Sequence, residues 1–329
     1  MEVIRYSADL REEWDDLVRS SRNGTFLFER QFMDYHADRF EDISLLFARK
    51  GKIVGVLPCS RHGDEIVSHG GLTYGGFILS NSTYATDVEE MLDETVKFYR
   101  AQNYKSLIVK PLPSIYHVQR SEEELYWMYR KGATLTARSI SSAIDLDAPL
   151  PFSTLRKRKL KKAMKAHLAV QEINSSTDNK SWAAYWEILT QVLHEKHSKK
   201  PVHSLAEILL LKERFPSQIQ LWTVLNSDGQ IIAGILLFIT KTVIHAQYIA
   251  ASLEGKANGA LDVLVHHLVD HYSRPIGDAH SSVTPHRPRF LDFGISTEDG
   301  GTYLNEGLIF QKEGFGARSI VYDAYTLQL

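Results

Sequence analysis

The densest group of chemically capable side chains is a run of cations between residues 156 and 165. It consists of Arg156, Lys157, Arg158, Lys159, Lys161, Lys162 and Lys165. Charge this dense attracts phosphates, so the run predicts an anion site, with Arg156 and Arg158 as candidate substrate contacts. The anion could be coenzyme A phosphate, a tRNA backbone, a nucleotide-linked precursor or an anionic lipid surface. The alternative is a solvated helix whose Leu and Met side chains turn inward.

A glycine-rich stretch, residues 68–76, is a second candidate. Gly71 and Gly75 would let the backbone approach an extended or anionic substrate, and Tyr74 would stack on it. A bulged strand followed by a turn is the alternative. Lys110 ends an apolar strand before Pro111, where a half-buried ammonium would require an anion such as a phosphate or carboxylate. Solvent exposure of Lys110 is the other interpretation.

The histidines do not predict a metal site. His267 and His271 lie four residues apart on one expected helix, but no third ligand follows at the spacing of a zinc site. Cys59 is the single cysteine of the sequence, so it can form neither an internal disulfide nor a Cys-rich site. A Gly-x-Ser-x-Gly elbow and a Walker motif are also absent from the sequence, which gives no support to those hydrolase and nucleotidase chemistries.

Composition indicates a globular, cytoplasmic protein. The 329 residues carry a formal net charge of −2, so the overall field does not attract nucleic acid. Charges alternate through the first residues where a secretory signal would be apolar. The apolar run 231–239 is far shorter than the roughly 20 residues of a membrane-spanning helix. We therefore expect no integral membrane segment.

The hydrophobic periodicity predicts helices and strands in a repeated order. In the first half we expect helices at 9–20, 28–35, 87–100 and 121–129, and strands at 43–49, 53–59, 106–110 and 134–146. In the second half we expect three helices before a meander at 219–225, 231–240 and 243–250. Ser153 could cap the first helix, Ser181 precedes the apolar residues of the second, and Ser204 begins a capping box of the third. A helix at 260–272, a strand at 289–293, a helix at 303–313 and a strand at 319–327 follow.

This order resembles the GNAT acyltransferase fold, in which a glycine-containing loop before the central helix holds the pyrophosphate of coenzyme A. The corresponding stretch here is Glu254-Gly-Lys-Ala-Asn-Gly-Ala260. The resemblance implies acyl-CoA or acetyl-CoA as a co-substrate, held by backbone N–H groups at a helix N-terminus. The implied cofactor-binding residues are Gly255, Lys256, Asn258, Gly259 and Ala260.

Nearly the whole chain is similar to the bacterial Fem-type peptidyltransferases and FemAB-like acyltransferases. The resemblance is carried by residues 68–76, 109–116, 156–162, 290–296, 305–307 and 312–316. It implies an α/β fold (mixed α+β) of two tandem GNAT-like domains. We expect residues 1–150 to bind acceptor and residues 151–329 to bind donor. Tyr116, Asn305 and Lys312 join the implied substrate contacts.

Acyl transfer to an amine requires a proton acceptor and donors for the oxyanion. By the GNAT resemblance, Asp292 and Ser296 flank the strand end at the acyl site and could accept or relay the amine proton. Tyr322 could protonate the leaving group. The alternatives are a turn in which Asp292 and Ser296 bond only backbone, and a Tyr322 that only packs.

We therefore expect an N-acyltransferase that moves an acyl or aminoacyl group from an activated carrier to an amine of a cell-envelope or polysaccharide precursor. One rival is an aminoacyl-tRNA-dependent peptidyltransferase. The other is a non-catalytic module that binds nucleic acid or an anionic polymer through the basic helix. Contact of that helix with a membrane surface is a further expectation.

Overall fold

A computed structural model describes residues 1–197, 199–273 and 287–329. The chain divides into two compact units. The first contains Met1–Ile140, Thr297–Leu304 and Ile320–Leu329, and the second contains Ser141–Ser296 and Asn305–Ser319. The division expected at residue 150 thus falls between Ile140 and Ser141, and two later segments return to the first unit.

The first unit packs helices against two sheets. Its helices are α1 (Arg11–Ser20), α2 (Arg30–Met33), α3 (Ala85–Arg100) and α4 (Glu123–Arg130), with 3-10 turns at Ala8–Leu10, Phe26–Phe28, Asp34–His36, Ser114–Tyr116 and Asp299–Gly301. One sheet has the order β1-β3-β4-β7, from β1 (Glu2–Arg5), β3 (Leu45–Arg49), β4 (Lys52–Leu57) and β7 (Ile78–Leu79). The other runs β9-β17-β8-β6-β5-β2, from β9 (Thr134–Asp145), β17 (Arg318–Gln328), β8 (Ser106–Val109), β6 (Glu65–Val67), β5 (Ser60–His62) and β2 (Glu41–Asp42). A two-stranded ribbon joins β15 (Thr297–Glu298) to β16 (Tyr303–Leu304).

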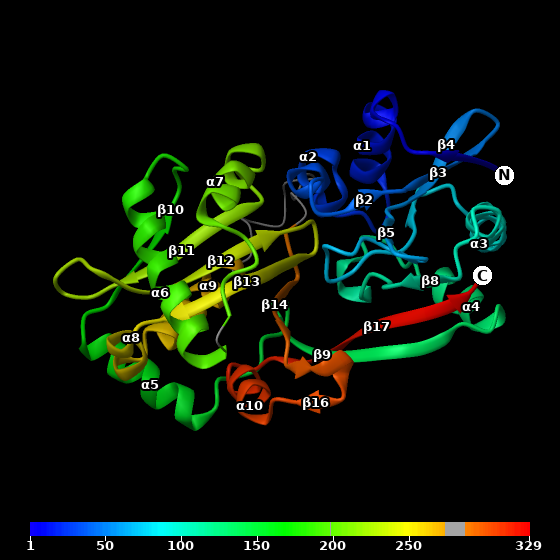
Figure 1. Ribbon diagram of the computed structural model, residues 1–329. Coiled ribbons are helices and arrows are strands. Elements are labelled where there is room, and N and C mark those ends of the chain that lie inside the picture. The colour runs from blue at the N-terminus through cyan, green and yellow to red at the C-terminus, as the bar shows by residue number, and fades with distance from the viewer. Residues whose placement is uncertain (198, 274–286) are drawn as a thin grey trace, which may run out of the picture. The chain divides into compact units, whose positions relative to one another are not determined.

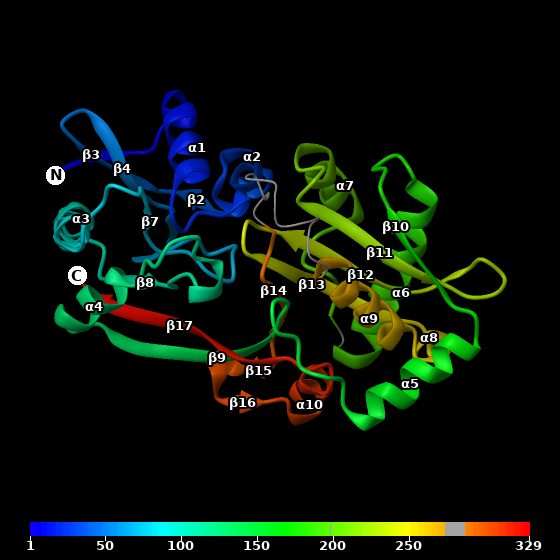
Figure 2. The same ribbon diagram turned by 180° about the vertical axis from the view of Figure 1, so that it is seen from behind.

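The second unit is one mixed sheet between helices. Its strands run β10-β11-β12-β13-β14-β9, from β10 (Ala169–Ile173), β11 (Ile219–Leu225), β12 (Ile231–Ile239), β13 (Val243–Ala251) and β14 (Phe290–Ile295). Its helices are α5 (Thr154–Lys165), α6 (Asn179–His197), α7 (Leu205–Arg214), α8 (Leu253–Asn258), α9 (Ala260–Ser273) and α10 (Glu306–Gly314). Helices α6 and α9 cover opposite faces of β11–β13 (Figures 1 and 2).

Alternation along β12 explains how both faces of this sheet are covered. Ile235 and Leu237 join the core cluster under α9, together with Leu264 and Leu268 of that helix. Gly234, the residue before Ile235, faces the other side, where a Cβ would lie 2.6 Å from the Tyr185 ring on α6. A strand that is apolar on both sides is typical of a sheet buried between two layers of helices.

Local signals account for most element boundaries, with some exceptions. Ser204 and Glu207 form the expected capping box of α7, and Ser153 accepts from the Arg156 N–H at the start of α5. The capping box expected at Ser121 is wrong, because α4 begins after Glu122 without a side-chain cap. The helix expected at 28–35 is also wrong, since α2 has only four residues between 3-10 turns. Strand β10 and helix α8 were not expected.

The fold class is confirmed as a mixed α/β structure with largely antiparallel sheets flanked by helices. The repeat of elements implied one separate sheet for each half of the chain. Instead, the sheet of the second unit and the larger sheet of the first share strand β9. Residues Thr134–Ile140 of β9 belong to the first unit and Ser141–Asp145 to the second. The last strand, expected in the second module, pairs through Tyr325–Gln328 with β8 of the first. Within the described ranges, every helix is too short or too polar to cross a lipid bilayer.

Candidate functional site

Strands β13 and β14 of the second unit pair in parallel for only three residues and then part. The paired residues are Val243–His245 on β13 and Phe290–Asp292 on β14. Beyond them β13 stays with β12, while β14 remains paired with β9 across a register shift between Asp292 and Ile295, where Gly294 adopts a φ of +73°. His245 and Asp292 form the last register pair, so their side chains lie where the two strands separate.

Asp292 is fully buried, and its carboxylate accepts hydrogen bonds from Ser141, His245 and Gly294. Its Oδ2 lies 2.8 Å from His245 Nδ1, and its Oδ1 accepts from Ser141 Oγ at 2.5 Å and from the Gly294 N–H at 3.2 Å. A carboxylate only accepts, so Nδ1 carries the hydrogen of its bond. In the neutral ring the proton-accepting nitrogen is therefore Nε2. The His245 side chain is 21% exposed, whereas the Asp292 side chain is completely buried.

A buried lysine approaches the same strand end from α10. Lys312 Nζ donates to the carbonyl oxygens of Gly294 and Ile295 at 2.7 and 2.8 Å. Desolvation lowers the pKa of Lys312 to about 8, and the charge of Asp292 opposes this shift. The third N–H of the ammonium has no acceptor among the residues that the structure describes. Lys312 can thus offer one donor at the end of β14.

Asn305 and Ser296 connect α10 to β14. Asn305 caps α10 through its side chain, which accepts from the Leu308 N–H, and its own N–H bonds the Ser296 carbonyl at 2.9 Å. The Ser296 hydroxyl is buried and finds no hydrogen-bond partner within the described ranges. Of the residues chosen from sequence, Asp292, Ser296, Asn305 and Lys312 therefore gather around one strand end.

The expected pyrophosphate cradle does not form. Residues 253–258 are helix α8 rather than a loop, and Gly255, Gly259 and Ala260 are buried. A Cβ at Gly255 would lie 2.3 Å from the carbonyl oxygen of Ile232, and one at Gly259 would lie 2.7 Å from that of Lys159. Lys256 is exposed and Asn258 half-buried. These glycines allow close packing of protein segments, so this stretch does not fit coenzyme A.

The two arginines chosen from the basic run have different surroundings. Arg156 is buried, pairs with Asp262 at 3.1 Å and lies 4.4 Å from the centre of the Phe315 ring. Its charge is thus satisfied inside the protein, and it joins α5, α9 and the end of α10. Desolvation raises the pKa of Asp262, and the charge of Arg156 opposes this shift. Arg158 is exposed on α5.

The glycine-rich segment of the first unit packs tightly. Lys110 donates to the carbonyl oxygens of His69 and Leu72. Its ammonium is thus bound by backbone carbonyls rather than by the phosphate or carboxylate that the sequence suggested. Desolvation lowers the Lys110 pKa to about 8. Gly75 is buried against Ser68, whose carbonyl oxygen would lie 2.1 Å from a Cβ there. Gly71 is exposed at the turn.

Three predicted tyrosines meet in the first unit. The Tyr74 and Tyr116 ring centroids are 4.6 Å apart, and Tyr322 donates to the Tyr116 hydroxyl at 3.2 Å. All three are buried. Tyr322 thus belongs to a tyrosine cluster of the first unit, whereas Asp292 and Ser296 belong to the second.

Sequence reasoning missed His245 and Ser141. The sequence signal for His245 was one histidine in the otherwise apolar start of a strand, Val243-Ile-His-Ala246. Ser141 offered none, because its role depends on the pairing of β9 with β14.

Solved structures with the same arrangement of elements cover nearly the whole chain. FemX superposes with a TM-score of 0.67 at 13% identity, over 100% of this chain and 98% of its own. L-PGS from Bacillus licheniformis gives 0.63 at 10% identity, over 98% and 92%. A tandem GNAT protein from the clavulanic acid biosynthesis pathway gives 0.51 at 11% identity, over 99% and 98%.

The chain has a Fem-like tandem GNAT fold. At these identities the likeness concerns the fold alone. No protein-family model and no curated protein sequence matches the chain. Within this tandem GNAT fold, the parting of β13 from β14 next to His245 and Asp292 is the feature on which we base the chemistry.

Proposed function

We propose that the chain is an N-acyltransferase that moves an acyl or aminoacyl group from an activated carrier to an amine of a cell-envelope or polysaccharide precursor. The observation that carries the proposal is the His245–Asp292 pair at the point where β13 and β14 separate. The tandem GNAT fold supports the reaction class. The Fem-type resemblance supports the acceptor class and a bacterial cytoplasmic setting.

The attacking amine forms a bond to the carbonyl carbon and must lose a proton. In this proposal Nε2 of His245 takes that proton, and Asp292 stabilises the imidazolium and fixes the ring orientation. Ser141 and the Gly294 N–H hold Asp292 in place. The bond from the carbonyl carbon to the carrier then breaks, and His245 returns the proton to the departing carrier atom.

Lys312 would stabilise the oxyanion that forms on the carbonyl oxygen. Two of its hydrogens are bound to the Gly294 and Ile295 carbonyls, which fix the direction of the ammonium. A preorganised donor in a desolvated site contributes roughly 3–4 kcal/mol to transition-state stability in comparable oxyanion holes. The buried position of Lys312 is consistent with such a role.

The packing of Gly255 and Gly259 argues against a carrier held by its pyrophosphate in the GNAT manner. This favours the second candidate function, an aminoacyl-tRNA-dependent peptidyltransferase of the Fem type. We assign acceptor binding to the first unit, at the exposed turn around Gly71. Donor binding is assigned to the second unit, which carries His245.

The test is transfer of a labelled acyl group from acetyl-CoA, long-chain acyl-CoA or aminoacyl-tRNA to an amine-bearing nucleotide-linked precursor. RNase treatment separates the RNA-dependent reaction from the others. His245→Gln and Asp292→Asn should each lower turnover by about 10²–10⁴-fold while the chain stays folded. His194→Gln, at an exposed position on α6, is the matched control. Unchanged turnover in both site variants, or no transfer from any donor, would refute the proposal.

A further inference from the structure

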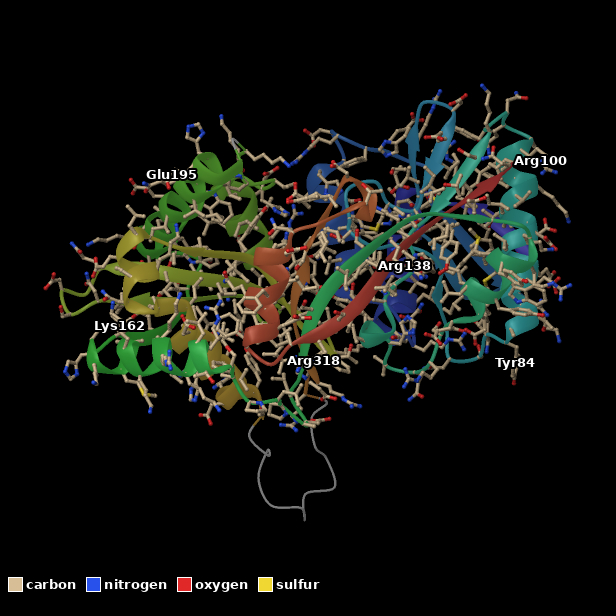
Figure 3. All side chains as sticks on the ribbon, turned by 90° about the horizontal axis from the view of Figure 1, so that it is seen from below. Tyr84, Arg100, Arg138, Lys162, Glu195 and Arg318 are labelled. Carbon is tan, nitrogen blue, oxygen red and sulfur yellow. The ribbon has the colours of Figure 1, made fainter. Side chains whose placement is uncertain are left out.

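The outward face of α5 combines positive charge with exposed aliphatic side chains. No acidic residue occurs in this helix, and its exposed cations are Lys157, Arg158, Lys161, Lys162 and Lys165. Lys162 is labelled on α5 in Figure 3, where nitrogen-tipped side chains project along the helix. Leu155 and Met164 are 47% and 56% exposed, and because they are nine positions apart they lie on opposite flanks of this cationic face.

The buried side of α5 explains why these residues face outward. Arg156 and Ala163 are buried against the unit, and they lie seven positions apart, on the same side of the helix. At 3.6 residues per turn, Arg158, Lys161 and Lys165 then lie on the opposite side. The alternative interpretation of the basic run, in which its Leu and Met side chains turn inward, is wrong for Leu155 and Met164.

A mainly apolar pocket of about 400 Å³ opens beside α5. Its walls are the segment 149–152, Lys157 and Leu160 of α5, and residues of α9, all within the second unit. Leu150, at its edge, is 43% exposed. Val269 contributes aliphatic surface, and Asp270 and Ser273 are polar. The volume lies within the roughly 300–1,000 Å³ that small-molecule pockets occupy.

We propose that α5 docks the second unit on an anionic phospholipid surface. The exposed cations bind lipid phosphates, Leu155 and Met164 enter the acyl-chain region, and the pocket receives one acyl chain. A phosphate polymer such as RNA would use the cations but offers no apolar partner for the exposed Leu and Met. A lipid surface offers phosphates to the cations of the outward face and an apolar boundary to Leu155 and Met164 at its two flanks. This proposal does not depend on the proposed transferase activity.

The test is co-sedimentation of the full chain with vesicles of phosphatidylcholine alone or with one quarter phosphatidylglycerol. Binding should require phosphatidylglycerol and weaken as salt increases. Each cation near such a surface strengthens binding about fivefold, so Lys161→Glu/Lys165→Glu should weaken it at least roughly 25-fold. Lys50→Glu/Lys52→Glu makes the same charge change at exposed positions of the first unit and is the control.

The apolar contribution is tested at constant charge. Leu155→Ser/Met164→Ser should also weaken vesicle binding, and Val269→Phe should weaken it by filling the pocket. Val202→Ser/Leu210→Ser, at exposed positions elsewhere, should bind as the wild type. Circular dichroism verifies that each variant is folded. If the Leu155/Met164 variant binds as tightly as the wild type while the Lys161/Lys165 variant does not, the helix binds by charge alone and the proposal fails. Absence of vesicle binding by the wild type would also overturn it.

Discussion

Glu124 should make the stability of the chain depend on pH in a measurable way. This carboxyl is buried, and its Oε1 accepts from the Phe77 N–H at 3.0 Å. Desolvation raises the Glu124 pKa from its ordinary value of 4.5 to about 8, and the Phe77 bond opposes the shift only in part. At neutral pH the folded chain therefore keeps this carboxyl protonated, whereas the unfolded chain ionises it.

The sign follows from proton linkage. The folded state binds the proton more tightly, so Glu124 contributes most to stability below pH 4.5, and the contribution is lost as pH rises toward 8. A shift of one pKa unit corresponds to about 1.36 kcal/mol. Between pH 4.5 and 7 the loss is about 3 kcal/mol, and it approaches about 5 kcal/mol above pH 8.

Glu124→Gln tests this because the amide keeps the acceptor for Phe77 but cannot ionise. Urea unfolding of the variant and the wild type from pH 5 to 8 should show the variant gaining relative stability as pH rises. Glu12→Gln, at an exposed position on α1, should follow the wild type at every pH. A stability difference between Glu124→Gln and the wild type that stays constant within about 0.5 kcal/mol over this range would refute the reasoning.

The remaining predictions concern the second unit. If the Lys312 ammonium stabilises the oxyanion, wild-type turnover should fall about tenfold per pH unit above pH 8, and turnover independent of pH up to 10 would exclude that role. Ser141→Ala removes a hydrogen bond to the Asp292 carboxylate and should cost about 1.5–3 kcal/mol of unfolding free energy, measured by urea denaturation, together with a lowered kcat. Gly259→Ala should destabilise the chain more than Gly229→Ala in thermal unfolding. Both glycines have a positive φ, but only at Gly259 would the new Cβ meet a backbone carbonyl, so equal losses would contradict the packing argument.

The order of elements could be predicted because each leaves a local pattern. The period of the apolar residues marked α3 and α9, and the turn at Lys50-Gly51 fixed the β3–β4 hairpin. The assignment of β17 could not be predicted, since its pairing with β8 joins distant parts of the chain. Local pattern shows that a strand forms but not which strand lies beside it.

The candidate site shows the same limit. Asp292 was recognisable as a polar residue at a strand end, but its partner His245 depends on the parallel register of β13 with β14. The glycines at 255 and 259 have the spacing of a ligand-binding turn, yet their missing side chains make room for Ile232 and Lys159. A glycine in the sequence indicates close approach without showing whether a ligand or another segment approaches.

The return of residues 320–329 to the first unit affects how the protein is made. That unit also contains residues 1–140, so its sheet lacks the strand next to β8 until residues 325–328 have been synthesised. An N-terminal domain usually completes its folding while the next domain is still being synthesised. The first unit of this chain cannot complete its sheet in that order. The exposed side of β8 must wait, in a nascent protein, for a partner translated more than two hundred residues later.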